Sequence, residues 1–588
     1  MELNILNTIN SPEELKKLNK DQLITLADEI RDVIIKKVST TGGHFGPNLG
    51  MVEATIALHY IFNSPVDKIV YDVSHQSYPH KMLTGRKHGF IDQDKYNSIT
   101  GYTSPKESEH DFFVVGHTST SISLACGLAK ARDIKGAKEN IIAVIGDGSL
   151  SGGEAYEGLN NAAASGKNII IIVNDNDMSI AENYGGLYQN LALLRQTEGK
   201  AENNFFKALG FEYHYVNDGN NLDSLIDTFS KVKDTDHPVV VHIHTIKGKG
   251  YTDAEINKEP FHWVMPFDLE TKKPLVNFSG ESYSQITDNF LCEKASKDNS
   301  IIGITAGTPV SVGFKSFRYK FKDQFIDVGI AEEHAVALAS GIASQGGKPV
   351  ASFLSSFIQR TYDQLSQDLA INNNPALLLV HSTGISSGDV THIGIFDIPL
   401  ISNIPNIVYL APTSKEEYIA MMDWGIEQDK YPVAIRVPRH EVISTGHKVS
   451  ADFSNLNTYV KVNEGSEVAI IGLGAFYDLG EKVQKRLKDT VGIDATLINP
   501  RFISGIDKDM LTDLLENHKL VITLEDGLLD GGFGEKISRF YSDKDMKVLN
   551  FGASKEFTDK VDINELYNRY HLTEKLIVED IKNTLKSL

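Results

Sequence analysis

Short runs of consecutive apolar residues recur along the chain and alternate with segments of helical spacing. Three runs in the first half begin at Ile141, Ile169 and Val239. Because polar residues do not alternate within them, each run predicts a strand buried on both faces, as in a parallel sheet. The runs farther along begin at Ile301, Lys348, Ala376, Val468, Asp494 and Lys519. This rhythm predicts βα units and doubly wound α/β sheets.

The first helix is expected near the start of the chain. Ser11 is a good N-cap, Pro12 suits the first turn, and apolar residues from Leu23 to Ile34 recur at helical spacing. The periodic pattern then weakens over residues 252–282, where a linker is expected, and a polar stretch at 445–465 marks a second boundary. The pattern therefore predicts three α/β domains, at residues 1–275, 283–445 and 460–588.

Composition narrows the function classes. The net charge of −20 over 588 residues argues against a nucleic-acid partner, which would need concentrated Lys and Arg. The only two cysteines, Cys126 and Cys292, form no metal or disulfide pattern. Because no apolar run approaches the roughly 20 residues of a membrane span and the first residues lack a signal-peptide layout, we expect a cytoplasmic protein without a membrane partner.

One spacing carries specific chemistry. Gly146-Asp147-Gly148 follows one predicted buried strand, and Asn174-Asp175-Asn176 ends the next. Two parallel strands joined by a helix would bring Asp147 and Asn176 together at the carboxyl edge of the sheet. A carboxylate and an amide oxygen suit Mg²⁺, while Gly148 and the helix start at Ser149 suit a diphosphate. The set resembles the thiamine-diphosphate signature.

Longer strings carry a more specific resemblance. They begin at Val73 (VSHQSYPHKMLTGR), Gly116 (GHTSTSIS), Gly146 (GDGSLSGGEAYEGLNNA), Asn174 (NDNDMSI), Asp327 (DVGIAEEHAVALASGIA), Phe357 (FIQRTYDQ) and Ala434 (AIRVPR). Together they look like the 1-deoxy-D-xylulose-5-phosphate synthase family and cover essentially the whole chain. The resemblance implies a transketolase-like fold of three α/β domains, a homodimer, and thiamine diphosphate with Mg²⁺ as cofactors. It also implies joining of pyruvate, with loss of CO₂, to D-glyceraldehyde 3-phosphate, a step that feeds isoprenoid, thiamine and pyridoxal precursors.

Site roles follow from the same resemblance. Glu332 matches the carboxylate that shares a proton with the aminopyrimidine ring, and Phe357 matches the aromatic residue that packs on this ring. The remaining implied roles are catalytic for His44, His262 and His392; cofactor-binding for His75, Gly116, His117, Ser119, Gly148, Ser149, Asn176 and Lys247; metal-binding for Asp147, Asn176 and the Met178 carbonyl; and substrate-binding for Arg360, Asp389, Arg436 and Arg439.

The acceptor end departs from the family pattern. Leu354 stands where the family usually has Tyr, and Ser382 stands where it usually has Arg, two residues that help to hold the acceptor phosphate. Loss of two hydrogen bonds to a charged group without replacement costs roughly 3–6 kcal/mol. His381 is new in this chain, and it could compensate in part together with Arg360, Arg436 and Arg439.

Three alternatives follow from these patterns. The departures favour a related thiamine-diphosphate transferase with another acceptor, or a transketolase-type transfer. A non-catalytic relative is disfavoured by the intact Glu332, Asp147 and Asn176. A dinucleotide enzyme is disfavoured because the glycine turns at 472–474 and 531–534 lack the full G-x-G-x-x-G spacing.

Overall fold

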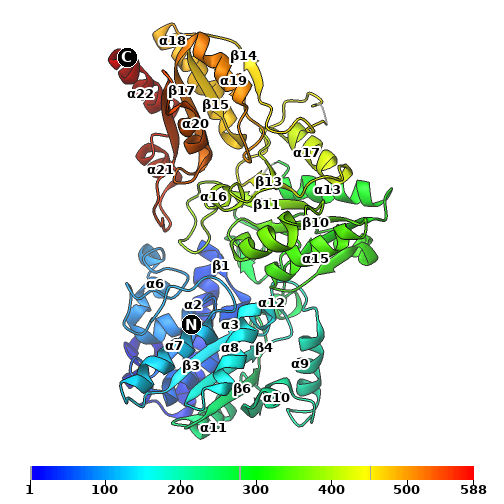
Figure 1. Ribbon diagram of the computed structural model, residues 1–588. Coiled ribbons are helices and arrows are strands. Elements are labelled where there is room, and N and C mark those ends of the chain that lie inside the picture. Colours follow the sequence, from blue (N-terminus) through cyan, green and yellow to red (C-terminus); the bar gives the residue numbers. More distant parts are fainter. Residues whose placement is uncertain (1–2, 277–279, 450–451) are drawn as a thin grey trace. The chain divides into compact units, whose positions relative to one another are not determined.

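The computed structural model describes residues 3–276, 280–449 and 452–588, and these divide into two compact units. Unit 1 comprises Met1–Ser279 and Gly329–Ala331, and unit 2 comprises Gly280–Val328 and Glu332–Leu588. Figure 1 traces the chain through both units. Each unit is described below by itself.

Unit 1 is built on a parallel sheet with the strand order β2-β3-β4-β6-β5. Its strands are β2 (Lys68–Tyr71), β3 (Ile141–Gly146), β4 (Ile169–Asp175), β5 (Glu212–Val216) and β6 (Pro238–His244), and two short strands, β1 (Gly43–His44) and β7 (Trp263–Val264), pair antiparallel. The helices are α1 (Pro12–Leu15), α2 (Lys20–Thr41), α3 (Gly46–Gly50), α4 (Val52–Ile61), α5 (Tyr78–Lys81), α6 (His88–Ile91), α7 (Ser121–Ile134), α8 (Gly153–Ala164), α9 (Gly186–Gln196), α10 (Phe205–Leu209), α11 (Leu222–Val232) and α12 (Thr252–Ile256).

Helices cover both faces of this sheet (Figure 1). Ile141 and Ile145 pack into a core with α7 and α8, whereas Ile142 and Val144 pack into another with α4 and α11. Successive side chains of a strand point to opposite faces, so a strand covered on both sides must be apolar at every position. This explains the uninterrupted apolar runs of the sequence.

Unit 2 contains two sheets. The first has the parallel order β12-β13-β11-β10-β8-β9, and the second has the order β14-β16-β15-β17-β18 with only β14 antiparallel. The strands are β8 (Ile301–Thr305), β9 (Phe325–Asp327), β10 (Lys348–Leu354), β11 (Leu377–Thr383), β12 (Val408–Leu410), β13 (Val433–Pro438), β14 (Val460–Asn463), β15 (Glu467–Gly472), β16 (Thr496–Asn499), β17 (His518–Leu528) and β18 (Lys547–Ala553). The predicted α/β class is confirmed.

The two sheets of unit 2 share one hydrophobic core. It joins Phe353 and Tyr409 of the first sheet to Ile471 and Ile498 of the second. The helices of the unit are α13 (Tyr283–Ala295), α14 (Phe317–Lys320), α15 (Glu332–Ser344), α16 (Asp397–Ile401), α17 (Lys415–Glu427), α18 (Tyr477–Val491), α19 (Lys508–Asp513), α20 (Phe533–Tyr541), α21 (Ile563–Arg569) and α22 (Glu574–Ser587). This shared core explains why the two sheets form one compact unit.

Two local predictions need correction. The single opening helix is wrong, because α1 ends at Leu15 and the Asn19 side chain caps a new helix, α2, by accepting from the Gln22 amide. The linker expected at 252–282 contains α12 and β7, and β7 pairs with β1. Residues 277–279 of that linker, and residues 450–451 of the boundary expected at 445–465, lie outside the described residues.

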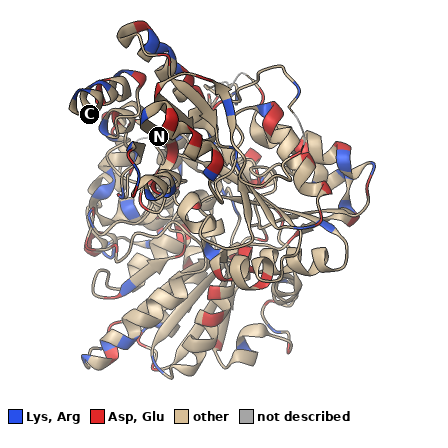
Figure 2. Ribbon diagram, turned by 45° about the horizontal axis from the view of Figure 1, so that its top comes forward, with Lys and Arg blue, Asp and Glu red and all other residues tan. Residues whose placement is uncertain are grey.

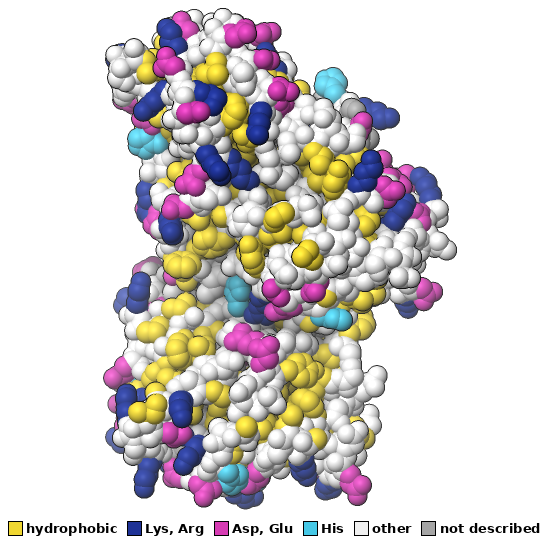
Figure 3. Space-filling view, in the orientation of Figure 1, with side chains coloured by type: hydrophobic (Ala, Val, Ile, Leu, Met, Phe, Trp, Pro, Cys, Tyr) yellow, Lys and Arg dark blue, Asp and Glu magenta, His cyan; other side chains and the backbone are white. Residues whose placement is uncertain are grey.

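Charged residues are interspersed. Figure 2 shows acidic and basic positions mixed along the helices, and the face in Figure 3 carries both signs of charge among apolar side chains.

Candidate active site

The ends of β3 and β4 bring the predicted metal ligands together in unit 1. The two strands are adjacent and parallel, with Gly146 beside Asn174. The Asp147 amide donates to the Asn174 carbonyl at 3.0 Å, and the Met178 amide donates to Asp147 Oδ2 at 3.0 Å. The turn after β4 therefore folds back over the Asp147 carboxylate, as the spacing predicts.

The donor set at this turn fits a hard divalent cation. Asp147 is 2% exposed, and burial together with the neighbouring Asp175 raises the pKa of its carboxyl to about 7. Asn176 Oδ1 and Asn183 Oδ1 are buried and have no hydrogen-bond partner among the described residues. Buried oxygens of this kind require a partner, and oxygen ligands are those that Mg²⁺ prefers.

Asn183 belongs to this turn although the sequence reasoning missed it. Its Nδ2 donates to Asp147 Oδ2 at 3.1 Å, which places its unpartnered oxygen next to the predicted metal ligands. Behind the turn, Arg195 of α9 donates to both oxygens of Asp175 at 2.8 and 2.6 Å and to Asp177 at 2.6 Å. His242 of β6 contacts Asp175 at 2.9 Å. These contacts hold Asp175 and Asp177, the residues on either side of Asn176, in place. In the sequence, the Asn174-Asp175-Asn176 string was the only sign of these contacts.

The string from Gly116 is held by a buried carboxylate of its own unit. Asp72 accepts from the amides of Ser119 at 2.8 Å and Ser121 at 2.9 Å, and the Ser119 hydroxyl donates to the Ser149 carbonyl at 2.8 Å. Asp72 therefore engages both of these amides at the start of α7. Gly116 is buried and His117 is half-buried in the same string.

Gly148 leaves room for the metal turn. A Cβ at Gly148 would lie 2.5 Å from Ser179 Oγ and 2.8 Å from Ser179 Cβ. The Ser179 carbonyl in turn accepts from Lys247 Nζ at 2.5 Å. Lys247 is 2% exposed, and burial lowers its pKa to about 7. The glycine therefore allows a close approach between the start of the 3₁₀ turn Gly148–Ser151 and residue 179.

Three predicted histidines form a cluster in unit 1. The ring centroids of His44, His75 and His262 lie 5.0–5.6 Å apart, and Tyr102 contacts the His44 ring at 5.8 Å. The pairing of β1 with β7 brings His262 to His44. Lys247 Nζ lies 3.1 Å from His262 Nδ1, and burial lowers the pKa of His262 well below its usual value. A neutral imidazole can accept a hydrogen bond from the Lys247 side chain, and imidazoles are the side chains best suited to exchange protons with a bound carbonyl compound near neutral pH.

Glu332 is the first residue of α15 in unit 2. It is 2% exposed, and its Oε2 has no hydrogen-bond partner among the described residues. Burial raises its pKa to about 7, although the Arg360 guanidinium at 3.8 Å acts in the opposite direction. A buried carboxyl that changes its protonation state near neutral pH is suited to share a proton with a ligand nitrogen.

Four other predicted residues lie in the same unit as Glu332, and one of them, Arg360, reaches its carboxyl. Phe357 is the N-cap of the 3₁₀ turn Ile358–Thr361, which carries Arg360, and its ring lies 5.6 Å from that of His392. His392 Nδ1 is 3.2 Å from Asp389 Oδ1 and 2.8 Å from Thr391 Oγ1. Burial opposes ionisation of Asp389, but its contacts with His392 and Thr391 hold its pKa below the usual range. An imidazole oriented by a carboxylate is an arrangement suited to proton transfer.

Arg436 does not join this group. It is 2% exposed, its Nε donates to Asp397 Oδ2 at 2.7 Å, and its Nη1 forms an ion pair with Asp526. Because both carboxylates are fully buried, the guanidinium is committed to neutralising them. These pairings leave Arg436 less suited to the acceptor phosphate than Arg360 or Arg439. The side chain of Arg439, three residues later, is exposed.

Two of the residues that differ from the family pattern, Leu354 and His381, are neighbours in the sheet. Leu354 of β10 lies opposite His381 of β11 in register, so both side chains point to the same face. His381 is 3% exposed, and burial lowers its pKa to about 3, which keeps it neutral. Ser382 has a left-handed backbone with φ 59°.

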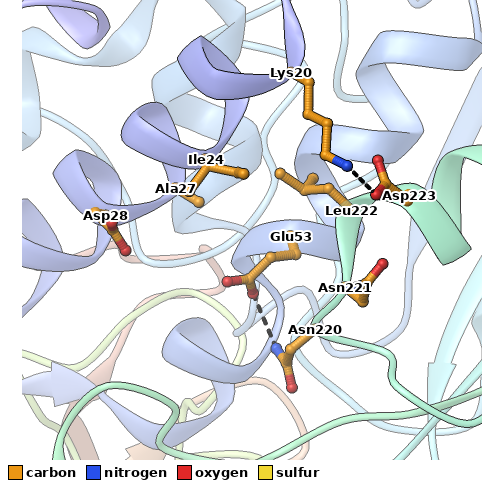
Figure 4. Close-up of a pocket in the computed structure, with 9 residues that line it drawn as sticks. All are labelled: Lys20, Ile24, Ala27, Asp28, Glu53, Asn220, Asn221, Leu222 and Asp223. Atoms are coloured by element: carbon orange, nitrogen blue, oxygen red, sulfur yellow. Dashed lines mark hydrogen bonds and ion pairs between the residues drawn. The ribbon is translucent and has the colours of Figure 1, made fainter.

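A separate pocket lies on unit 1. It has a volume of about 340 Å³ and contains none of the predicted site residues (Figure 4). Its lining residues are Lys20, Ile24, Ala27, Asp28, Glu53, Asn220, Asn221, Leu222 and Asp223. Several polar groups in it already pair, since Lys20 contacts Asp223 and Asn220 donates to Glu53 at 2.9 Å.

Within the described residues, no cluster of three or more His, Cys, Asp or Glu side chains forms a metal site.

Comparison with known families matches almost the whole chain. Residues 6–202 and 194–245 match the family model described as 1-deoxy-D-xylulose-5-phosphate synthase. Residues 280–444 match the pyrimidine-binding domain of transketolase, and residues 458–577 match the C-terminal domain of transketolase. The predicted transketolase-like fold is confirmed by these two matches.

Curated relatives match over nearly their full length. The chain is 39% identical to the 1-deoxy-D-xylulose-5-phosphate synthase of Caldanaerobacter subterraneus, over 99% of this chain and 100% of that one. The corresponding enzymes of Halothermothrix orenii and Alkaliphilus oremlandii are also 39% identical, over 98% and 99% of this chain and 96% and 99% of theirs. In the part of the chain that the structure describes, no helix is both long and apolar enough to cross a membrane.

Proposed function

The chain belongs to the 1-deoxy-D-xylulose-5-phosphate synthase family, and from this we propose that it joins pyruvate, with loss of CO₂, to D-glyceraldehyde 3-phosphate. The product would be 1-deoxy-D-xylulose 5-phosphate, a precursor for isoprenoids, thiamine and pyridoxal. Thiamine diphosphate would be the cofactor and Mg²⁺ its metal. When bound, this cofactor supplies an electron sink for the two-carbon unit derived from pyruvate.

The buried carboxyl of Glu332 is the observation that carries the proposal. It lies in the segment that matches the pyrimidine-binding domain, and its unpartnered oxygen and pKa of about 7 suit a shared proton. Glu332 would hold a proton at N1′ of the aminopyrimidine ring, and Phe357 would pack against that ring. A carboxyl without these features would be an ordinary first-turn residue of a helix.

Unit 1 would bind the diphosphate end of the cofactor through the metal. Asp147, Asn176 and the Met178 carbonyl would hold Mg²⁺, and Lys247, buried beside Ser179, would add positive charge. Gly148 and Ser149 would let the backbone approach the phosphates, with Gly116, His117 and Ser119 in the adjoining string. Because Ser119 is engaged with Asp72 and Ser149, it would fix the shape of this string.

The histidines would move protons at the reacting carbonyl compounds. His44 and His262 have this role in the cluster of unit 1, where His75 would instead contact the cofactor, and His392 is oriented by Asp389 in unit 2. Arg360 and Arg439 are the cations proposed for the acceptor phosphate, because Arg436 is engaged elsewhere. The full-length synthase relatives support this reaction over transfer to a different acceptor, the alternative that Leu354 and Ser382 had suggested.

An assay of CO₂ release tests the proposal. Purified protein with Mg²⁺, thiamine diphosphate and pyruvate should release CO₂ much faster when D-glyceraldehyde 3-phosphate is added. Glu332→Ala should abolish this release, and Glu333→Ala on the same helix is the matched control. Release that does not depend on the acceptor, or full activity of Glu332→Ala, would contradict the proposal. The homodimer and the cytoplasmic location stay predictions.

A further inference from the structure

We propose that the C-terminal part of unit 2, residues 458–588, positions the loop that carries Asp389 and His392, and that Asp559 is a positioning residue of this loop. The loop runs over residues 384–396, between β11 and α16. The importance of the loop for the reaction rests on the proposed function. Its anchoring by the C-terminal part rests on contacts within unit 2.

The apolar side chains of the loop belong to the core of the C-terminal sheet. Ile385, Ile393 and Ile395 are only 4%, 7% and 4% exposed, and they pack with residues such as Leu524 and Leu528 of β17. The sheet from which the loop emerges uses other cores. The loop therefore takes its shape from burial against the C-terminal part, because that is where its apolar surface leaves water.

Hydrogen bonds hold the loop at several points. The Leu528 amide donates to the Ile395 carbonyl at 3.2 Å, and the Lys560 amide donates to the Gly388 carbonyl at 2.9 Å. The Val390 amide donates to the Asp559 side chain at 3.3 Å. The last two contacts flank Asp389, so the segment between β18 and α21 fixes the backbone on both sides of this carboxylate.

The base of the loop is closed against β17. The Gly384 amide donates to the Gly394 carbonyl at 2.7 Å, and a Cβ at Gly384, where φ is +104°, would lie 2.4 Å from Asp526 Oδ2. Asp526 also pairs with Arg436, which holds Asp397 at the start of α16. The ion pairs of Arg436 with Asp397 and Asp526 therefore connect the residue that follows the loop, Asp397, to β17 of the C-terminal part.

These anchors bear on the proposed site through His392. Its ring contacts Phe357, and its Nδ1 contacts Asp389, so a shift of the loop backbone would move the imidazole relative to Phe357. Glu332 and Phe357 lie outside the loop. Loosening the loop should therefore impair the use of the acceptor while leaving cofactor binding intact.

The test compares three variants of the full-length enzyme. Asp559→Ala removes the oxygen that accepts from the Val390 amide, whereas Asp559→Asn retains an acceptor oxygen. Asp580→Ala is the matched control, because Asp580 lies on α22 of the same part and pairs with His571. Three quantities are measured for each variant. They are the hydrogen–deuterium exchange of residues 384–396 without substrates, kcat/KM for D-glyceraldehyde 3-phosphate, and the Kd for thiamine diphosphate.

Asp559→Ala should exchange faster across residues 384–396 and lose about threefold to tenfold in kcat/KM, with the cofactor Kd unchanged. Asp559→Asn and Asp580→Ala should both resemble the wild type. Unchanged exchange in Asp559→Ala, or an equal effect of Asp580→Ala, overturns the inference. If the wild type forms no product, the proposed function is wrong, and the exchange measurement alone still decides whether Asp559 positions the loop.

Discussion

Replacement of Glu332 by Gln should stabilise the cofactor-free protein in a pH-dependent way. The pKa of this carboxyl is about 7 in the folded protein, against an ordinary value of 4.5. The folded state therefore holds the proton more tightly than the unfolded state. The stability of the wild type must fall as pH rises from about 4.5 to about 7, and the full cost remains above pH 7.

The size of the effect follows from the pKa. Each pH unit between the two values corresponds to about 1.4 kcal/mol, so the ionised carboxyl costs about 3 kcal/mol at pH 8 and no more than about 1 kcal/mol at pH 5. Gln is neutral and similar in size, so it avoids this cost. The gain in the free energy of unfolding should therefore be about three times larger at pH 8 than at pH 5.

Calorimetric unfolding of the cofactor-free protein between pH 5 and pH 8 measures this gain. The difference in Tm between Glu332→Gln and wild type should grow with pH and level off above pH 7. Glu333→Gln, the neighbouring substitution, serves as the control and should show no such trend. A Tm difference that is constant with pH, or that shrinks as pH rises, would refute the argument that burial holds this carboxyl protonated.

The remaining predictions concern the metal turn and the buried ion network. Gly148→Ala should weaken Mg²⁺-dependent binding of thiamine diphosphate at least about tenfold in calorimetric titration, because its Cβ would collide with Ser179; unchanged affinity would show that this close approach is unnecessary. Arg195→Ala should weaken Mg²⁺ binding several-fold in the presence of thiamine diphosphate, because Arg195 braces both flanks of Asn176; an equal Kd would remove that role. Arg436→Ala should cost about 3–5 kcal/mol of stability, because it removes the guanidinium that pairs with the buried carboxylates of Asp397 and Asp526; a Tm within 1 °C, on the order of a few tenths of a kcal/mol, would contradict it.

The central strands were predictable because of where they lie. β3, β4 and β6 are covered on both faces, so each begins with a run of apolar residues and turns polar only toward its carboxyl end, if at all. β5 and β14 lie at sheet edges and are partly exposed, so their patterns are mixed and did not predict strands. The break between α1 and α2 depends on a cap at Asn19, which the periodic apolar residues beyond it concealed.

The candidate site was predictable where its residues are close in sequence to a strand end. Asp147 and Asn176 follow adjacent parallel strands, so their spacing in the sequence was sufficient to predict that they lie at the same edge of the sheet. The ion pairs of Arg436 were not predictable, because its partners, Asp397 and Asp526, lie 39 and 90 residues away and no local pattern reveals them. The anchoring of residues 384–396 by the C-terminal part was likewise not visible, since it depends on side chains that meet only in the folded unit.

The most direct test of the proposed function is identification of the product by ¹³C NMR. Pyruvate labelled at carbons 2 and 3 is incubated with D-glyceraldehyde 3-phosphate, Mg²⁺, thiamine diphosphate and the wild-type enzyme, with Glu332→Ala run in parallel. The account predicts that the two adjacent labels appear as the methyl and ketone carbons of 1-deoxy-D-xylulose 5-phosphate, and that the variant forms none. If the labels appear in another compound while the cofactor is bound, or if the variant forms the same product at the same rate, the account is contradicted.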